Sequence, residues 1–502
     1  MCAVWRQCVL KRWHSRQSMP SCAHGRPIYK TEAERKGGHM HKKAWQFANG
    51  MTRAAVPVLQ TEEEKQWTEN KLSIGDIDIE ETRARWCTRV PGSRAPDYVF
   101  IGGIQATENM GYDVSEAEAM MPAIQRAYDE HDDAALLMLT AKLLNVLGRA
   151  PKVTGHPYWS YCYYNSFEDH AAEVHFPAPV PLAFSEAQRL ERVHSGWLAQ
   201  IAGAAVGTII EGYCTDQLRS AFGEIRGYLR QPTTYNDDVL FELAFLNAYR
   251  AKGRAVTSED IGMEWVGRIE YTWSGEEAAF KNMKRGIFPP HSATVNNPWR
   301  EWIGAQMRGA ICGMVAPGDP ELAARLAWTD GAVSHVNNGV LGEVFNAMLV
   351  ALAYTEHSVR TVLEKAIALL PARSEYYSVV RFAWEACEKH SAWEPAWREC
   401  EKKYERYNWI HTYPNAAAEV VSLYFGGDSF DECMHICAMC GQDVDCNAGQ
   451  IGTVYGVMQG YAGIREQWTA PFEDKFDSLF RGYEHTTITR LAQDTLDAWK
   501  YL

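Results

Sequence analysis

Two aspartates stand one residue apart in a short polar stretch near the C-terminal end of the sequence. The stretch GQDVDC covers residues 441–446 and contains Asp443, Asp445 and Cys446. Carboxylates this close repel each other unless a cation lies between them. Oxygen ligands of this kind suit Mg²⁺ or Mn²⁺, whereas an acidic turn exposed to water would need no ion. The hexapeptide alone is compatible with both interpretations.

A second acidic stretch, TTYNDDVLFEL at residues 233–243, begins a helical segment. Asn236 is a good N-cap, and Asp237 and Asp238 would fall in the first helical turn, where negative charge is favourable. These preferences explain the three residues without any ligand. They leave open a second role as oxygen donors.

Two further loop segments contain polar residues suited to a binding site. The segment GAAVGTIIEGY, residues 203–213, has glycines that permit close backbone approach, and Glu211 follows its apolar run. The segment 297–339 contains four candidates, namely Gly304, Arg308, Ser334 and His335. A surface glutamate at a helix end and a structural histidine are the simpler alternatives.

In their order and residue patterns, these four segments resemble the ADP-ribosylglycohydrolase family. The resemblance covers roughly residues 195–465. NDDV resembles the family's T/S/D-D-D triplet, and IGAQMR resembles its G-x-x-M-R substrate loop. DGAVSH resembles its Ser-His element, and GQDVDC resembles its G-x-D-x-D-T metal loop. This resemblance implies an all-α fold, two bound magnesium ions and cleavage of a glycosidic bond at a ribose anomeric carbon.

The resemblance also implies roles for individual residues. The two acidic loops would face each other across two Mg²⁺ ions, with Mn²⁺ as an alternative. The expected metal ligands are Asn236, Asp237, Asp238, Asp443, Asp445 and Cys446. Asp237 and Asp443 would also take part in catalysis, and Glu211 is the weaker candidate for a base or nucleophile. The expected substrate-binding residues are Gly304, Arg308, Ser334 and His335.

Four positions depart from the family pattern. Thr208 replaces an aspartate, and Asn236 stands where Thr or Ser is common. Cys446 also replaces a common Thr, and sulfur is a poor ligand for Mg²⁺. Ile303 stands where a polar residue often precedes the substrate-loop glycine. From Ile303 we expect a substrate that depends little on a diphosphate at that position.

Helical periodicity dominates the chain, which predicts an all-α fold with functional residues on the connecting loops. Residues 116–148 read as two helices and residues 237–251 as one. The best candidate for a strand is DYVFIGGI, residues 97–104. A small-residue face that would let helices pack closely consists of Gly449, Gly452 and Gly456.

We expect three segments: a basic leader at 1–50, a helical and aromatic-rich extension at 51–190, and a catalytic domain at 191–502. The prolines of HFPAPVPLAF break helical structure near 175–190. The leader is either an organellar transit peptide or sequence upstream of a start at Met40 or Met51, and we expect it to be dispensable.

An aromatic stretch lies at residues 155–170, within the expected extension. Its aromatic side chains could stack on a sugar or base, or they could pack in the core. The candidates for stacking are Trp159, Tyr161, Tyr163 and Tyr164.

Charge and cysteine content narrow the class of protein. The net charge is −13, yet residues 1–50 carry ten Lys or Arg against two Glu, so the rest of the chain is strongly acidic. An acidic body argues against nucleic acid as a main partner and is compatible with cation binding. No apolar run approaches the roughly 20 residues of a membrane helix. Thirteen scattered cysteines, an odd number, indicate a reducing compartment, and we expect a cytoplasmic protein.

One cysteine cluster needs an interpretation of its own. Cys433, Cys437 and Cys440 recur at helical spacing, and Cys446 follows them. A zinc site usually uses more closely spaced pairs in loops, which favours small buried core residues over a metal–thiolate site.

The predicted function is a metal-dependent hydrolase that cleaves an N- or O-glycosidic bond at a ribosyl anomeric carbon. The expected substrate is a small molecule or an ADP-ribosyl or glycosyl conjugate. Two alternatives stay open: a glycosidase for a non-nucleotide sugar, and a catalytically silent ADP-ribose-type binding protein on the same fold. Thr208 and Cys446 fit lost chemistry, but a binding protein would have no need of four close aspartates.

Overall fold

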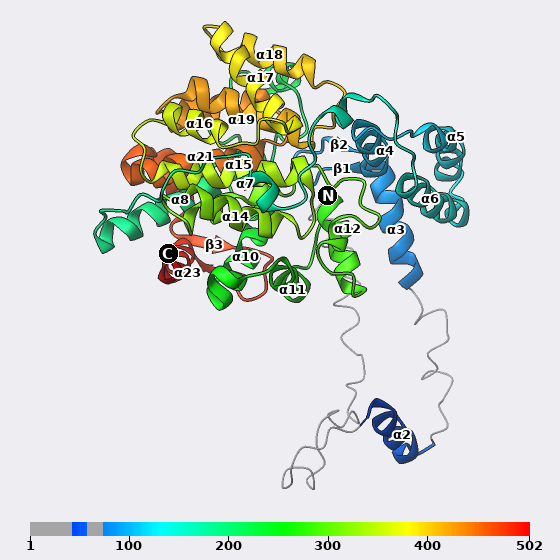
Figure 1. Ribbon diagram of the computed structural model, residues 1–502. Helices are drawn as coiled ribbons and strands as arrows, with labels where there is room; N and C mark the ends of the chain where they lie inside the picture. The colour runs from blue at the N-terminus through cyan, green and yellow to red at the C-terminus, as the bar shows by residue number, and fades with distance from the viewer. Residues whose placement is uncertain (1–42, 58–73) are drawn as a thin grey trace, which may run out of the picture. The chain divides into compact units, whose positions relative to one another are not determined.

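The computed structural model describes residues 43–57 and 74–502 of the chain (Figure 1). This part of the chain is mostly helical, and its strands form only two short two-stranded ladders, which confirms the predicted all-α fold. The chain divides between Glu81 and Thr82 into two compact units. The larger unit, Thr82–Leu502, contains every residue of the site described below. Much of the expected leader lies outside the described residues.

The helices have the following bounds. In the first half of the chain they are α2 Ala44–Ala54, α3 Ile74–Cys87, α4 Val99–Asn109, α5 Ser115–Asp129, α6 Asp133–Gly148, α7 Phe167–Ala171, α8 Glu186–Gly207, α9 Thr215–Phe222 and α10 Asp238–Lys252. In the second half they are α11 Ser258–Arg268, α12 Ser274–Lys284, α13 Ala310–Met314, α14 Pro320–Gly331, α15 Asn337–Ala353, α16 Val359–Ala368, α17 Glu375–Lys389, α18 Trp393–Lys403, α19 Thr412–Gly426, α20 Phe430–Cys440, α21 Val444–Gln459, α22 Glu466–Thr469 and α23 Ile488–Ala498. The strands are β1 Thr88–Arg89, β2 Pro96–Asp97, β3 Lys475–Asp477 and β4 His485–Thr487.

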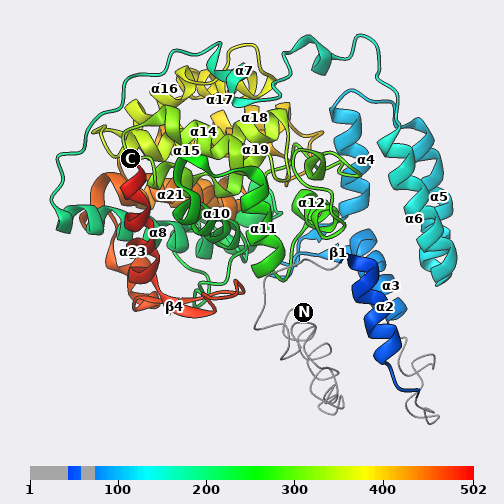
Figure 2. The ribbon, with the colours of Figure 1, turned by 60° about the horizontal axis from the view of Figure 1, so that its bottom comes forward.

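Helices α8 and α21 lie side by side, and α21 also packs on α15 (Figures 1 and 2). Glycines permit this close packing, because a Cβ on Gly456 would lie 2.2 Å from the Ser195 carbonyl oxygen. A Cβ on Gly452 would lie 2.8 Å from the carbonyl oxygen of Ala199. The close-packing face predicted on α21 is therefore confirmed at these two glycines, which hold the second half of α21 against the middle of α8.

The predicted helix pair at 116–148 is present as α5 and α6, which pack on each other in both views (Figures 1 and 2). The strand predicted at 97–104 is wrong, since all but its first two residues belong to α4. The glycine pair of α4 explains the difference. Gly102 and Gly103 leave room for the rings of Trp302 and Trp299, so one face of the helix is buried against these rings.

A short hairpin connects α3 and α4. Strands β1 and β2 pair antiparallel, with Thr88 opposite Asp97. The turn between them lies against the end of α8, where a Cβ on Gly92 would meet the Thr208 carbonyl oxygen at 2.0 Å. The Tyr213 hydroxyl donates to the Ser93 carbonyl over 3.0 Å. The hairpin is thus tightly docked beside the segment that carries Glu211.

Two sequence-based expectations about composition can be compared with the structure. The side chains of Cys433, Cys437 and Cys440 on α20 are fully buried, in agreement with core packing. Among the residues that the structure describes, no helix is both long enough and apolar enough to cross a membrane.

Candidate active site

The two acidic loops lie next to each other. Asn236 precedes α10, and Asp443 precedes α21. The Asn236 Nδ2 atom donates to Asp445 Oδ2 over 3.2 Å, and Cys446 Sγ donates to Asp238 Oδ1 over 3.3 Å. Possible ligand atoms of Asp443, Asp445 and Cys446 lie within 4.8 Å of one another. The structure brings these five predicted ligands together, and their role in holding metal remains a prediction.

Backbone hydrogen bonds fix Glu211 beside the second acidic loop. Gly212 N–H donates to the Gln442 carbonyl over 2.8 Å, and Gln442 N–H donates to the Tyr213 carbonyl over 3.0 Å. Gln442 has a left-handed backbone, with φ 67°. This reciprocal pair joins the chain after α8 to the chain before α21, so Glu211 and Asp443 have a defined separation.

The start of α21 is fixed from two further sides. A Cβ on Gly207 would lie 2.0 Å from the backbone nitrogen of Asp445, so only glycine permits this contact with α8. Asn415 of α19 accepts hydrogen bonds from Asp443 N–H at 3.0 Å and from Asn447 Nδ2 at 2.8 Å. Asn415 therefore orients the loop through its backbone and leaves the carboxylates free.

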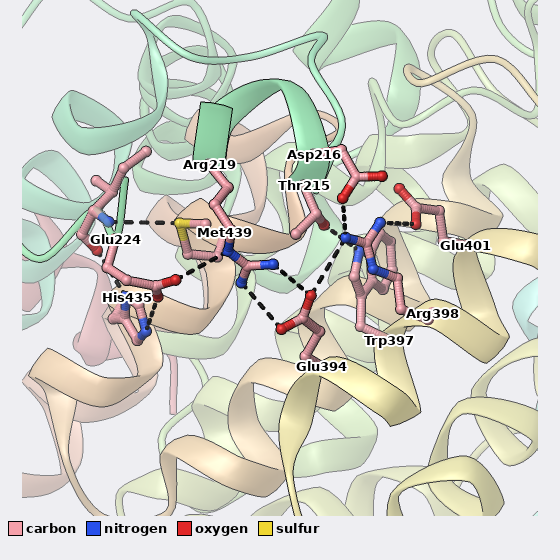
Figure 3. A network of polar contacts seen from close by, with 11 residues as sticks. Thr215, Asp216, Arg219, Glu224, Glu394, Trp397, Arg398, Glu401, His435 and Met439 are labelled. Atoms are coloured by element: carbon pink, nitrogen blue, oxygen red, sulfur yellow. Dashed lines mark hydrogen bonds and ion pairs between the residues drawn. The ribbon is translucent and has the colours of Figure 1, made fainter. Parts of the chain in front are cut away.

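Helix α9, which follows Glu211, is tied to α18 and α20 by the polar network of Figure 3. The buried Trp397 Nε1 donates to Thr215 Oγ1 over 2.9 Å. Around it, Arg219 donates to Glu394 and to Glu224, and Arg398 donates to Asp216, Glu394 and Glu401 (Figure 3). Exposed ion pairs of this kind each contribute about 0–1 kcal/mol, so the buried indole bond is the firmest anchor of α9.

Three buried carboxylates in the acidic loops have an oxygen without a hydrogen-bond partner. These atoms are Asp238 Oδ2, Asp443 Oδ1 and Asp445 Oδ1. Burial, together with the neighbouring carboxylates, raises the pKa of Asp238 and of Asp443 well above the usual range. Unpaired buried carboxylates are costly, and bound divalent cations would remove that cost. The oxygen-rich donor set therefore fits the magnesium that the family resemblance implies.

Two of the residues that depart from the family pattern have contacts within the protein. Burial raises the pKa of the Cys446 thiol well above its usual value, and its sulfur also lies 3.9 Å from Met307 Sδ. The Thr208 hydroxyl donates to the Ala204 carbonyl within its own helix over 2.9 Å. The main metal ligands would be oxygens of the aspartates.

A cavity of about 260 Å³ adjoins the acidic loops. Asp237, Asp443 and Asp445 line it together with Glu211 and Glu276. Desolvation and the Asp445 carboxylate raise the pKa of Asp237 to about 6, although part of its side chain reaches solvent. None of the described residues that line the cavity is Lys, Arg or His. The cavity therefore presents acids and aromatic rings to a substrate.

Sequence reasoning missed several residues of the cavity wall. They are Asp97, Tyr235, Tyr271, Trp273, Glu276 and Trp409. Glu276 reads in the sequence as an ordinary acid in the first turn of α12. The aromatic residues stand in short loops without periodicity, so no local pattern marks them as neighbours.

The substrate-loop segment lines the cavity with Ile303 and Gly304. Ile303 N–H donates to the Ile410 carbonyl over 2.8 Å, so this loop is paired to the chain before α19. A Cβ on Gly304 would lie 1.4 Å from Glu276 Oε1. Glycine is required here because the Glu276 carboxylate lies directly against the backbone.

Arg308 is placed differently from the expectation, since it is fully buried and does not line the cavity. Its Nε donates to Asp330, its Nη1 donates to the Gly304 carbonyl, and its Nη2 donates to Ser334 Oγ over 3.1 Å. Its guanidinium lies 3.6 Å from Glu276. In this arrangement Arg308 supports the cavity through Gly304 and Glu276, and the geometry does not favour direct contact with a substrate.

Ser334 and His335 lie behind the same wall. Both are buried, and the Ser334 hydroxyl is 2.7 Å from His335 Nδ1. Burial and the nearby Arg308 lower the pKa of His335 well below its usual range, so the imidazole is neutral. Neither residue lines the cavity, and we assign them to the support of Arg308.

The aromatic stretch at 155–170 lies away from the cavity. Tyr158 donates to Glu301 over 2.7 Å, and Trp159 Nε1 donates to the Gly111 carbonyl over 2.9 Å. No residue of the stretch lines the cavity, and these contacts agree with core and interface packing.

Comparison with known proteins decides the family. The sequence model of the ADP-ribosylglycohydrolase family matches residues 185–501. The chain belongs to the ADP-ribosylglycohydrolase family. An uncharacterized protein of Archaeoglobus fulgidus is similar, with 24% identity over 310 residues, which is 57% of this chain and 92% of the relative.

A solved structure described as an ADP-ribosylglycohydrolase-related protein complex is also similar. It shares 17% identity at a TM-score of 0.42 and covers 63% of this chain and 99% of its own. No residue assignment follows from a likeness this distant. Members of the ADP-ribosylglycohydrolase family are typically metal-dependent, which agrees with the buried Asp443, Asp445 and Cys446 group. The family match begins at the N-cap of α8, so the hairpin at 88–97 lies outside it.

Proposed function

We propose that this protein is a metal-dependent hydrolase that cleaves an N- or O-glycosidic bond at a ribosyl anomeric carbon. The observation that carries the proposal is the set of three buried, unpartnered carboxylate oxygens of Asp238, Asp443 and Asp445 beside a cavity. Single oxygens of this kind also occur at other buried acids, such as Glu242 and Glu419, but at the acidic loops they lie next to one another beside a cavity, an arrangement that suits divalent cations. Family membership supplies the reaction class.

The residues of the two acidic loops would have two roles, in binding cations and in stabilising positive charge on the substrate. Asn236, Asp237 and Asp238 would hold cations from one side, and Asp443 and Asp445 from the other. Bound Mg²⁺ would polarise sugar hydroxyls and lower the pKa of a water. The carboxylates would stabilise the positive charge that develops at the anomeric carbon as the glycosidic bond breaks. The hydrolysis adds water across that bond and leaves a proton on the departing group.

Glu211 is the candidate to accept a proton from the attacking water. It lines the cavity, and it is fixed beside the metal loop by the Gly212–Gln442 backbone bond of 2.8 Å. Asp237 is the second candidate, since it reaches the cavity from the opposite loop. The two can be distinguished by replacing each with its amide and comparing kcat with metal affinity.

The cavity favours a substrate that needs no positive side chain. Asp97, Glu211 and Glu276 add to the acidic loops, and no described lining residue is basic. A diphosphate would therefore find no partner cation in the wall, because Arg308 is buried behind it. We expect hydrolysis of a ribosyl or simple glycosidic substrate without a diphosphate, within about tenfold in kcat/KM of the ADP-ribosyl analogue.

The test is a side-by-side assay of an ADP-ribosyl conjugate and the matched simple riboside. Each is measured with Mg²⁺, with Mn²⁺ and with chelator. A preference above a hundredfold for the ADP-ribosyl compound would reject the argument from a cavity wall without basic residues. Turnover of neither compound, with ADP-ribose still bound, would favour the catalytically silent binding protein. The departures at Thr208 and Cys446 are compatible with that alternative.

A further inference from the structure

Asp97 is a buried acid of the cavity wall that the proposed reaction does not use. It lies in β2 of the hairpin, outside the region matched to the family. Its side chain is 1% exposed, yet it lines the cavity. Trp273 Nε1 donates to Asp97 Oδ2 over 2.6 Å, while Asp97 Oδ1 has no hydrogen-bond partner. One oxygen is thus held in place and the other is open.

The surroundings of Asp97 are rigid. Arg85 lies over the Trp273 ring at 4.7 Å and is itself held by Glu277 through two hydrogen bonds, of 2.9 and 2.7 Å. Tyr271 and Trp273 stack with ring centroids 5.9 Å apart and planes 29° apart. The hairpin that carries Asp97 is docked on α8 by the close contact of Gly92. A fixed carboxylate therefore adjoins an aromatic wall.

The open oxygen has no cation of its own. Burial raises the pKa of Asp97 to about 6, against the Trp273 hydrogen bond and the charge of Arg85, which lower it. Near neutral pH a substantial share of the group is ionised, and an ionised buried oxygen without a partner is costly. A hydrogen-bond donor on a bound ligand would remove that cost. A planar ligand group would at the same time cover the rings of Tyr271 and Trp273.

We propose that Asp97 and Trp273 form a specificity subsite that selects a hydroxyl or N–H donor on the substrate group next to the ribosyl unit. The inference rests on the proposed function in placing the ribosyl unit at the acidic loops. The inference adds Asp97 as a specificity determinant, and Asp97 comes from the hairpin at 88–97, outside the region matched to the family. Asp97 is a binding residue and takes no part in bond cleavage.

The probes are 4-aminophenyl and 4-nitrophenyl ribofuranosides, each as both anomers. Their aglycones share a planar ring, but the first ends in N–H donors and the second only in acceptors. The decisive variant is Asp97→Asn in the full chain. Its amide oxygen can keep the Trp273 hydrogen bond, so its NH₂ group takes the place of the open oxygen. An acceptor is thereby exchanged for a donor at a single position.

Selectivity is measured as the amino-to-nitro ratio of kcat/KM where turnover occurs, and of calorimetric Kd where it does not. Comparing this ratio between parent and variant cancels the different leaving-group abilities. We expect Asp97→Asn to lower the ratio by about tenfold or more, the size of one lost charge-assisted hydrogen bond. The matched control is Asp113→Asn, an exposed acid of the same extension that does not line the cavity.

Several outcomes would overturn the subsite. A ratio unchanged within about twofold in Asp97→Asn means that the aglycone does not reach this oxygen. If Asp97→Asn fails to fold, Trp273→Phe decides. It removes the hydrogen bond that holds the carboxylate in place, so the amino-to-nitro ratio should fall; an unchanged ratio overturns the proposal. Binding of neither riboside to the parent also overturns it, while a Mg²⁺ titration still tests the metal site alone. Selective binding without turnover would instead reject the hydrolase and keep the subsite.

Discussion

Arg308 and Asp443 both lie among buried acidic side chains, but only the Arg308 cluster contains its own cation. Around Arg308 lie Asp330, Glu343 and Glu276, with nitrogen–oxygen distances from 2.5 to 3.8 Å. Around Asp443 lie other aspartates, an amide and a thiol. Similar acid crowding is therefore resolved internally in one region and left open in the other.

The difference separates a structural region from a functional one. The Arg308 guanidinium offsets the negative charge of its three acids, although each of these acids also keeps one oxygen without a hydrogen-bond partner. Arg308 also braces the wall formed by Gly304 and Glu276. In the acidic loops three oxygens also lack a hydrogen-bond partner, but there the described residues that line the cavity include no Lys or Arg to offset the charge. The first region should consequently respond to mutation through stability, and the second through cation binding.

Arg308→Met gives the largest expected effect. Removing one partner from a buried ion pair leaves Asp330 and Glu343 uncompensated and costs about 3–5 kcal/mol of unfolding free energy. Urea unfolding measures the loss. The control is Arg149→Met, which breaks an exposed pair with Glu116 at 2.6 Å and should cost no more than about 1 kcal/mol. Equal losses in both variants would remove the distinction between Arg308 and a surface arginine.

Glu242→Gln tests another buried acid outside the acidic loops, through the pH dependence of stability. Burial raises the pKa of Glu242 from 4.5 to about 8, although Gln450 and Gln200 donate to it. A raised carboxyl pKa means that the folded state holds the proton more tightly, so this contribution to stability is lost as pH rises from about 4.5 through about 8.

The glutamine variant should therefore lose less stability than the parent between pH 5 and pH 8. The difference expected from this single group is of order a few kcal/mol. Unfolding free energies at several pH values, measured with chelator present, provide the comparison. Parallel pH profiles of parent and Glu242→Gln would contradict the raised pKa.

Asp443→Asn tests the open region. Loss of one ligand should weaken Mg²⁺ binding by about tenfold or more, as measured by calorimetric titration. In chelator the same variant should melt at a higher temperature than the parent, since one repelling charge is gone. Arg308→Met should behave in the opposite way, with lower stability and Mg²⁺ affinity changed far less.

The outcome for Asp445→Asn should match that of Asp443→Asn, and Asp113→Asn is the control for an acid outside the site. Parental Mg²⁺ affinity in both loop variants would show that the loops hold no cation. A destabilised Asp443→Asn protein in chelator would place this acid in the same class as those around Arg308.

The sequence predicts the helices well and the site in part. The residues of α10 and the close contact of Gly456 follow from periodicity and residue size, which are local properties. The meeting of Asn236 with Asp445 was implied by resemblance and joins loops that lie 209 positions apart, before α10 and at the start of α21. Asp97 and Trp273 could not be predicted, because their pairing joins segments 176 positions apart without any repeated pattern.

The sequence alone is hard to interpret where a residue type suits two roles. Arg308, Ser334 and His335 stand in the expected motifs, yet all three are buried behind the wall. An arginine suits phosphate binding and a buried acid cluster equally well. Only the positions of Asp330 and Glu343, which come from α14 and α15, decide between these roles.

Cys446→Thr gives the smallest expected effect and tests how close the thiol lies to the cation. The sulfur donates to Asp238 Oδ1 over 3.3 Å, and a threonine hydroxyl can keep that bond. If the side chain also touches the ion, replacing soft sulfur by hard oxygen should raise the ratio of Mg²⁺ to Mn²⁺ affinity, by less than about tenfold. The ratio comes from paired calorimetric titrations. Cys400→Thr, a buried cysteine that does not line the cavity, controls for the added branch and hydroxyl. An unchanged ratio in Cys446→Thr would show that the aspartates alone bind the ion, and that the departure from the family pattern at this position leaves the metal site intact.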